Sequence, residues 1–400
     1  MVYCRKMIPY SLYVHIPFCR HRCCYCDFNT YAGIDDLIPA YVDGLCREIE
    51  LLGEAAGERL PVHTVFFGGG TPSLLAATFL ERIMSALHVA FNLLPGLETT
   101  IEANPGSLSL VYLQELHDIG INRLSIGMQS AQPEELHLLE RQHDYEDVVK
   151  SVKWARQAGF RNLNLDLIFG LPQQDLPAWN QNLTLALNLR PEHLSLYALT
   201  LEHGTPMAHW VGHGLLPDID SDLSAEMYEL ADQRLVEAGF VQYEISNWAR
   251  LDGERDLLAC RHNLQYWRNL PYLGLGAGAH GFAASVRTAN ILSPAAYAQR
   301  CLKGIRGHFP VTPATVNTQP IDQVTEMGET MMMSLRLTQE GVSRKDFSNR
   351  FGRPVEEVYG GEIERLVRLS LLEQSGEDGD ILRLTPAGRL LGNQVFMQFV

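Results

Sequence analysis

Four of the chain's eight cysteines stand in one short run, Cys19-Arg-His-Arg-Cys-Cys-Tyr-Cys26. Three of them, Cys19, Cys23 and Cys26, have the spacing C-x3-C-x2-C. Three thiolates on one tight loop can hold three irons of a 4Fe–4S cluster, whereas such clusters are otherwise usually held by four cysteines. The fourth iron would then lack a protein ligand. An open iron is a place where another molecule can bind and react.

Zinc and disulfide bonds are the two alternatives for this run. Structural zinc takes four Cys or His ligands, often from two paired C-x2-C arms, and here only Cys24 or His21 offers a fourth ligand, in a sterically poor position. A disulfide framework is unusual for a chain with eight cysteines in 400 residues and no secretion signal. We therefore expect a cluster, with Cys24 as a bystander thiol.

The composition is that of an ordinary globular protein, with 46% hydrophobic and 20% charged residues. A formal net charge of −15 argues against nucleic-acid binding, which needs basic patches on phosphate. No apolar run reaches the roughly 18 residues that a membrane span requires, and the residues before the first predicted strand are too few for a targeting peptide. Free cysteines suit a reducing compartment. We expect a cytoplasmic protein without a membrane span.

Apolar runs of strand type alternate with amphipathic stretches of helical type. The predicted strands are 12–18, 64–67, 99–102, 124–128, 163–168 and 194–198. The predicted helices are 37–52, 73–89, 108–119, stretches up to about 158, 178–189 and 221–238. Six successive strand–helix units predict an α/β fold with a parallel sheet, closed as a partial (β/α)6 TIM-like barrel.

Polar or glycine-rich residues recur where these strands stop. They are Gly68-Gly-Gly-Thr71 after the second strand, Glu102 at the third, Gln129 at the fourth and Asp166 in the fifth. Taken singly, each is explained as a turn or a solvated strand end. The carboxyl ends of barrel strands meet at one rim, however, so their repetition predicts an active-site rim beside the cysteines.

The stretch Ser11-Leu-Tyr-Val-His-Ile-Pro-Phe-Cys19, followed by the three cysteines, resembles the radical S-adenosylmethionine (radical SAM) superfamily. Within it, the chain resembles the branch of the oxygen-independent coproporphyrinogen III oxidase, HemN, and the haem chaperone HemW. The resemblance covers essentially the whole chain. It implies a 4Fe–4S cluster and SAM, whose amino and carboxylate groups chelate the open iron, and a radical reaction that belongs to the cofactor.

The resemblance also assigns roles to single residues. The cluster ligands of the family match Cys19, Cys23 and Cys26. The SAM contacts of the family match Tyr13, Tyr25, Gly69, Gly70, Thr71 and Glu102. In HemN a second SAM is contacted by residues that match Gln129, Arg141 and Asp166. These residue types suit the ligand, because glycines allow close backbone approach, carboxylates accept hydrogen bonds from hydroxyl or ammonium groups, and an arginine fork clamps a carboxylate.

Two departures separate the chain from HemN. HemN has a further cysteine where this chain has Phe28, and it has a long N-terminal arm where this chain has twelve residues before Tyr13. The run His262-Asn-Leu-Gln-Tyr-Trp267 resembles the HNxxYW signature of the haem-chaperone branch. The resemblance therefore implies a haem chaperone. Its cargo would be haem, its clients haemoproteins such as respiratory enzymes, and its electron donor flavodoxin or ferredoxin if SAM is cleaved.

His262 is the candidate haem-binding residue, since a histidine can ligate haem iron. The alternative is a hydrogen-bonded structural histidine. Two enzymatic functions also stay open: oxidative decarboxylation of coproporphyrinogen III, as by a coproporphyrinogen dehydrogenase, and a radical SAM reaction on another substrate.

We expect three regions along the chain. Residues 1–240 would form the radical SAM barrel core, and 241–310 an extension with the HNxxYW run and a glycine-rich segment, 274–281. Residues 311–400 would form a HemN-like accessory domain, because their helix, helix and strand-hairpin order resembles a winged helix.

Overall fold

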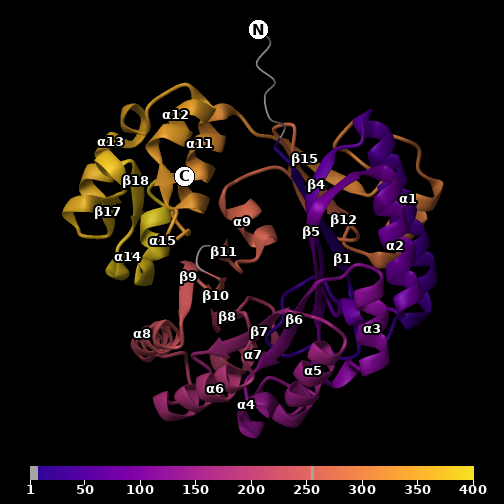
Figure 1. Ribbon diagram of the computed structural model, residues 1–400, viewed down its shortest axis with the longest axis horizontal. Coiled ribbons are helices and arrows are strands. Elements are labelled where there is room, and N and C mark those ends of the chain that lie inside the picture. Colours follow the sequence, from indigo (N-terminus) through magenta and orange to yellow (C-terminus); the bar gives the residue numbers. More distant parts are fainter. Residues whose placement is uncertain (1–7, 254–255) are drawn as a thin grey trace. The chain divides into compact units, whose positions relative to one another are not determined.

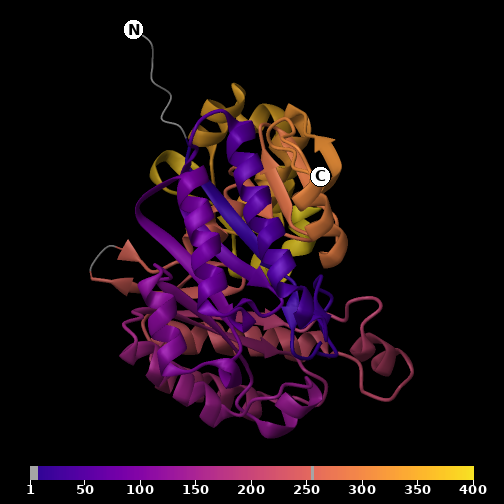
Figure 2. The same cartoon turned by 90° about the vertical axis from the view of Figure 1, so that its right-hand side faces the viewer.

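The computed structural model describes residues 8–253 and 256–400. By its internal contacts the chain divides into two units, which are described one by one (Figures 1 and 2). The first comprises residues up to Arg234 and Pro271–Gln319, and the second comprises Leu235–Leu270 and Pro320–Val400. The segment 241–310 is therefore shared between the two units. The division into three regions that we expect from the sequence stays a prediction.

The first unit is built on a sheet in which six parallel strands follow one another in chain order. These are β1 (Tyr10–Ile16), β4 (Pro61–Gly69), β5 (Asn92–Ala103), β6 (Arg123–Gln129), β7 (Asn162–Phe169) and β8 (His193–Ala198). All six predicted strands are thus confirmed. Six of the seven residues of β6 are buried, as in parallel strands that are covered on both faces.

The sheet continues on the other side of β1 with strands that the sequence reading missed. They are β12 (Tyr272–Leu275), which is parallel to β1, then β13 (His280–Ala283), β14 (Val286–Asn290) and β15 (Thr315–Pro320). A short parallel pair, β2 (Phe18–Cys19) and β3 (Tyr31–Ala32), frames the cysteine loop. This placement brings the glycine-rich segment 274–281 to the strand that leads into the cysteines.

Helices cover the outer face of the parallel strands (Figure 1). They are α1 (Ile38–Ala56), α2 (Ala77–Ala90), α3 (Leu110–Asp118), α4 (Pro133–Leu138), α5 (Tyr145–Gln157) and α6 (Leu176–Asn188). Later in the chain come α7 (Pro206–Gly212), α8 (Ser221–Glu237) and α10 (Pro294–Lys303). Short polar side chains fix several starts: Asp144 and Asp147 form a capping box at α5, and Asp175 caps α6. The predicted alternation of strands and helices is confirmed.

The second unit combines a hairpin with a small helical domain. Its elements are β9 (Phe240–Glu244), β10 (Asn247–Asp252), β11 (Asp256–Leu257), α9 (Arg261–Trp267), α11 (Gln323–Ser334), β16 (Val342–Ser343), α12 (Arg344–Phe351), α13 (Val355–Arg368), β17 (Leu372–Ser375), β18 (Ile381–Leu384), α14 (Pro386–Leu390) and α15 (Gly392–Phe396). The order of helix, helix and strand hairpin confirms the winged-helix-like prediction. Met331 is fully buried in its apolar core with Leu335 and Phe347.

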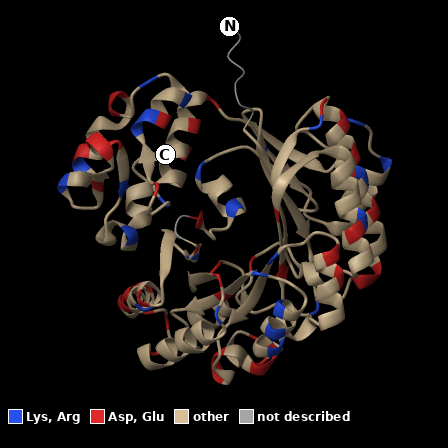
Figure 3. Ribbon diagram, in the orientation of Figure 1, with Lys and Arg blue, Asp and Glu red and all other residues tan. Residues whose placement is uncertain are grey.

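Charged residues of both signs are spread along the outer helices of the first unit (Figure 3). Within residues 8–253 and 256–400, no helix combines the length and the apolar character that crossing a bilayer would require.

Candidate functional site

The three spaced cysteines face one cavity. Cys19 ends β2, and the backbone N–H of Cys26 donates to the carbonyl of Cys23 at 3.2 Å, which closes the loop tightly. Cys19, Cys23 and Cys26 all line a cavity of about 570 Å³. The fourth cysteine of the run, Cys24, is fully buried in an apolar cluster, and its thiol donates to the carbonyl of Leu138 at 3.2 Å. This environment agrees with a bystander thiol.

The same cavity collects nearly all residues that the sequence marked. Its lining includes Cys19, Cys23, Tyr25, Cys26, Gly69, Gly70, Thr71, Glu102, Gln129, Arg141 and Asp166. These residues come from the ends of successive strands and from the loops that follow them. The residues of the predicted active-site rim therefore lie together in one cavity of the first unit. The binding role of each residue stays a prediction.

A chain of polar contacts joins two of the thiols. The Thr71 hydroxyl donates to Cys19 Sγ at 3.7 Å and accepts from the Asn104 side-chain amide at 3.0 Å. Asn104 Oδ1 accepts from Arg141 at 2.5 Å, and Arg141 also donates to Cys23 Sγ at 3.6 Å. The Thr71 hydroxyl opposes the rise that burial causes in the pKa of Cys19, and so favours the thiolate form that ligates iron. The sequence reading passed over Asn104, although it stands two residues after Glu102.

Thr30 is a second residue that the sequence reading missed. It is 5% exposed, and its hydroxyl lies beside the Cys19 and Cys26 thiols. Burial raises the pKa of Cys19 and of Cys26, and the nearby Thr30 hydroxyl opposes both shifts. A hydroxyl that donates to cysteine sulfur favours the thiolate form, so the residues present fit a thiolate-ligated 4Fe–4S cluster.

A single metal ion is the alternative to a cluster. Across the two described stretches of the chain, no three His, Cys, Asp or Glu side chains gather closely enough to hold one ion. The three cysteines nevertheless line the same cavity.

Two partly exposed carboxyl groups, those of Glu102 and Asp166, line the same cavity as these sulfurs. Glu102 accepts from the backbone N–H of Gly69 at 3.1 Å, and Asp166 accepts from Ser125 at 2.9 Å and from Asn164 at 2.8 Å. Burial raises the pKa of Glu102 to about 8, and the charge of Asp166 adds to the shift. Burial also raises the pKa of Asp166. A ligand with hydroxyl or ammonium donors would stabilise the ionised forms.

The glycines at the end of β4 have a packing requirement of their own. Gly69 has a φ of +112°, and a Cβ there would lie 2.4 Å from the His15 ring. A Cβ on Gly70 would lie 2.6 Å from the carbonyl oxygen of Phe18. These glycines let the loop pack against the end of β1 and against β2. Close approach of this backbone to a ligand stays a prediction.

Tyr13 lies behind this loop. Its phenol is 3.0 Å from His15 Nδ1, and its ring stacks on Phe66 with 6.4 Å between the ring centroids. Burial raises its pKa well above the ordinary range. Tyr13 thus touches the residue that packs on Gly69. Its direct contact with SAM stays a prediction.

His262 belongs to the second unit, on α9. It is 1% exposed, and its Nε2 lies 3.0 Å from the Tyr266 hydroxyl, with the two rings in an edge-to-face contact at 4.9 Å. Trp267 is covered by the Arg336 guanidinium, whose carbon lies 5.2 Å from the indole centroid. In this state the histidine is held inside the unit, which favours its structural alternative.

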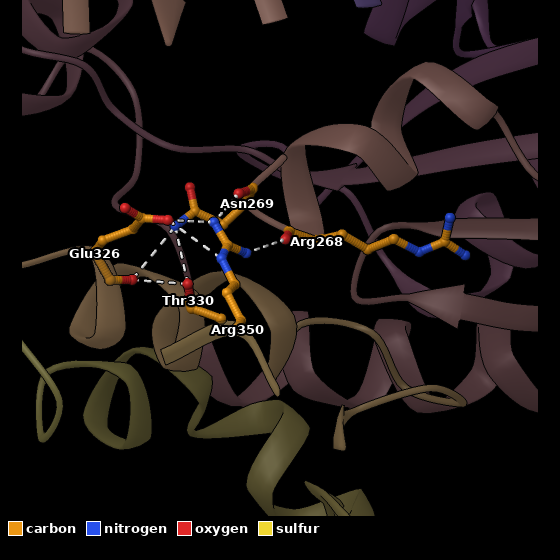
Figure 4. A network of polar contacts seen from close by, with 5 residues as sticks. All are labelled: Arg268, Asn269, Glu326, Thr330 and Arg350. Atoms are coloured by element: carbon orange, nitrogen blue, oxygen red, sulfur yellow. Dashed lines mark hydrogen bonds and ion pairs between the residues drawn. The ribbon is translucent and has the colours of Figure 1, made fainter. Parts of the chain in front are cut away.

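The carbonyls that end α9 are bound by one arginine (Figure 4). Arg350 donates to the carbonyls of Arg268 and Asn269 at 3.2 and 2.7 Å and pairs with Glu326 at 2.7 Å. The side chain of Asn269 donates to the Thr330 hydroxyl at 3.0 Å. A cation at a helix C-terminus satisfies free carbonyls and complements the helix dipole. The HNxxYW run is thereby fixed to α11 and α12.

Replacing Arg350 with glutamine is expected to loosen α9. The change leaves Glu326 and two carbonyls without their partner, which we expect to cost about 1–3 kcal/mol. Hydrogen exchange of the α9 amides should become roughly tenfold faster or more. Arg353→Gln is the matched control, because its pair with Glu357 is 53% and 60% exposed and exposed pairs contribute little. Equal exchange rates of the α9 amides in the two variants would contradict this role of Arg350.

Two family models match the chain. The model described as the Radical SAM superfamily covers residues 13–180, and the model described as the HemN C-terminal domain covers residues 321–391.

Curated relatives match over two thirds to nearly all of the chain. The protein named Heme chaperone HemW from Bacillus subtilis is 36% identical over 98% of this chain and 99% of its own. The one from Synechocystis is 38% identical over 83% of this chain and 79% of its own. A bovine protein named Radical S-adenosyl methionine domain-containing protein 1, mitochondrial, is 41% identical over 68% of this chain and 60% of its own.

One solved structure is similar over the whole chain. It is coproporphyrinogen III oxidase (HemN) from Escherichia coli, with a TM-score of 0.80 and 23% identity over 98% of this chain and 90% of that one. At this identity the likeness concerns the fold alone. It confirms the predicted fold class.

Proposed function

Because the chain belongs to the HemN/HemW branch of the radical SAM superfamily, we propose that it is a haem chaperone that binds haem and delivers it to client haemoproteins. The observation that carries the proposal is the similarity, over 98% of the chain, to a protein named Heme chaperone HemW. The HNxxYW run at 262–267 supports it. Respiratory enzymes as clients, flavodoxin or ferredoxin as electron donor, and a cytoplasmic location are parts of the same proposal.

The superfamily implies a 4Fe–4S cluster and SAM, and we propose that both are held in the cavity of the first unit. Cys19, Cys23 and Cys26 would ligate the cluster. When bound, the reduced cluster supplies the electron for SAM cleavage. The chain's own residues hold the ligands in place: Arg141 donates a hydrogen bond to Cys23 Sγ, and Glu102 accepts hydrogen bonds from SAM.

The haem contact is proposed at α9. Since Tyr266 holds His262 Nε2 in the ligand-free chain, ligation of haem iron by this nitrogen requires that the hydrogen bond is exchanged for the metal. The affinity for haem is then the difference between the two interactions. Because the two interactions compete, removal of the His262 side chain should weaken haem binding, and removal of the Tyr266 hydroxyl should strengthen it.

Haem titration of His262→Ala and Tyr266→Phe tests the proposal. His262→Ala should weaken haem binding about tenfold or more and shift the haem absorption bands, because the iron loses an axial ligand. Tyr266→Phe should strengthen binding severalfold, because it removes a competing bond of roughly 1 kcal/mol. His308→Ala, at an exposed position, is the control. Unchanged spectra and affinities in both α9 variants would return His262 to its structural role.

One observation favours an enzymatic alternative. Phe28 and Tyr197 line the cavity of the first unit although they are 65% and 42% exposed. Exposed aromatic faces beside a cofactor cavity suit a large, partly apolar substrate. Anaerobic incubation with reductant, SAM and coproporphyrinogen III decides between the functions. Protoporphyrinogen formation at a substantial rate would contradict a role restricted to chaperoning.

A further inference from the structure

Asn29 connects the cysteine loop to a distant part of the first unit. It stands three residues after Cys26, and its side-chain nitrogen donates to the carbonyls of Ala277 at 3.1 Å and Leu292 at 3.0 Å. Its side-chain oxygen accepts from the Tyr31 phenol at 3.1 Å. The amide thus bonds through both of its ends, to the glycine segment 274–281, to the backbone after β14 and to β3.

The glycine segment has a shape that admits this side chain. Gly278 has a φ of +76°, and a Cβ on it would lie 2.5 Å from the Asn29 side-chain nitrogen. Gly276 has a φ of +100°, and a Cβ there would lie 2.5 Å from the carbonyl oxygen of His15. Both glycines therefore permit close contact with the stretch that carries the cysteines.

Residues of α1 hold the glycine segment from the other side. The Tyr41 phenol accepts from the backbone N–H of Ala277 at 2.9 Å and donates to the carbonyl of His15 at 2.7 Å. The buried carboxylate of Glu48 accepts from the backbone N–H of Gly276 at 2.8 Å. The segment is consequently a fixed support with its polar groups satisfied, against which Asn29 can locate the loop.

His15 extends the support to the loop that follows β4. Its Nε2 donates to the backbone carbonyl of Asn29 at 2.9 Å, so the neutral ring accepts at Nδ1 from the Tyr13 phenol at 3.0 Å. The same ring packs against Gly69. One histidine therefore contacts the end of the cysteine loop and the glycine loop that is proposed to bind SAM.

We propose that Asn29 is a positioning residue. Its hydrogen bond to the glycine segment 274–281 fixes the loop and thereby the positions of the three cysteines. This assigns the segment to the cluster site, whereas its sequence neighbourhood had grouped it with the HNxxYW run. The inference rests on the proposed cluster but not on haem binding. It predicts that the loop loses its geometry when Asn29 can no longer donate.

Asn29→Asp keeps the shape of the side chain and replaces two donated hydrogen bonds by repulsion between a carboxylate and two carbonyls. In the anaerobically reconstituted protein, the variant should lose its cluster in air at least about fivefold faster. It should also lose the change that SAM causes in the electron paramagnetic resonance spectrum of the reduced cluster. In the cluster-free protein, amides of the loop should exchange faster. Asn317→Asp, at an exposed position, carries the same added charge as a control.

Equal cluster lifetime, spectrum and loop exchange in Asn29→Asp and Asn317→Asp would overturn the inference. If Asn29→Asp does not fold, Tyr31→Phe decides, since it removes only the bonds that the Tyr31 phenol donates to Asn29 and Leu292. A shortened cluster lifetime in that variant supports the role of Asn29, and an unchanged one refutes it. Failure of the unaltered protein to assemble any cluster would instead refute the proposed cofactor.

Discussion

Serine in place of Cys19, Cys23 or Cys26 is expected to abolish the iron–sulfur cluster. Each of these thiols lines the cavity, and a three-cysteine site has no spare ligand. Anaerobic reconstitution of the unaltered chain should give about four irons per chain, whereas each variant should retain less than about a tenth of the visible absorption of the cluster.

Cys24→Ser is the internal control for this experiment. The Cys24 thiol is buried in an apolar cluster and donates to a backbone carbonyl, and burial raises its pKa to about 12. It should therefore stay protonated and take no part in ligation. Iron content should remain at the unaltered level in this variant. Loss of iron in Cys24→Ser, with retention in Cys26→Ser, would contradict the ligand assignment.

Glu102→Gln is expected to weaken SAM binding about tenfold or more at pH 8.5. A buried carboxylate that accepts hydrogen bonds from a ligand contributes roughly 1.5–3 kcal/mol. The glutamine keeps the size of the side chain but loses the charge. Calorimetric titration of SAM into the reconstituted proteins measures the difference, with Glu98→Gln as a control for a buried carboxylate outside the cavity lining.

The effect of Glu102 should depend on pH in a defined direction. Burial raises its pKa to about 8, so the group is largely protonated at neutral pH in the ligand-free chain. SAM that binds the ionised form must displace a proton, and its affinity should rise by up to about tenfold per pH unit below pH 8 and level off above it. Glu102→Gln should lack this slope, and an equal slope in both proteins would exclude Glu102 as its source.

The same shift predicts the stability of the ligand-free chain. A carboxyl group whose folded pKa lies above its unfolded value of 4.5 favours the folded state below that value. The contribution is lost as the pH rises toward 8. The midpoint of thermal unfolding should therefore fall more steeply over this range in the unaltered chain than in Glu102→Gln.

The parallel sheet could be read from the sequence because its strands are short, apolar and regularly spaced. The alternation of strands and helices over residues 12–198 also predicted where the rim residues lie, because the carboxyl ends of parallel strands meet at one edge of the sheet. Glu102, Gln129 and Asp166 line one cavity for that reason. The cysteines whose spacing predicted a cluster line the same cavity.

Contacts between distant segments could not be read in this way. Asn104 shows its role only through neighbours far along the chain, such as Arg141. The glycines at 69 and 70 have a pattern that fits a ligand loop, but their packing partners are His15 and Phe18. The division of 241–310 between two units likewise depends on long-range packing, which local patterns do not encode.

Transfer of haem tests the central claim most directly. The reconstituted protein is loaded with one equivalent of haem, freed of unbound haem and mixed anaerobically with an apo-haemoprotein whose absorption differs from that of the donor. The proposal predicts that haem moves to the acceptor, and that His262→Ala, loaded in the same way, transfers less. A chain that retains no haem after removal of the unbound fraction, while its cluster is intact and coproporphyrinogen III is converted, would contradict the chaperone function.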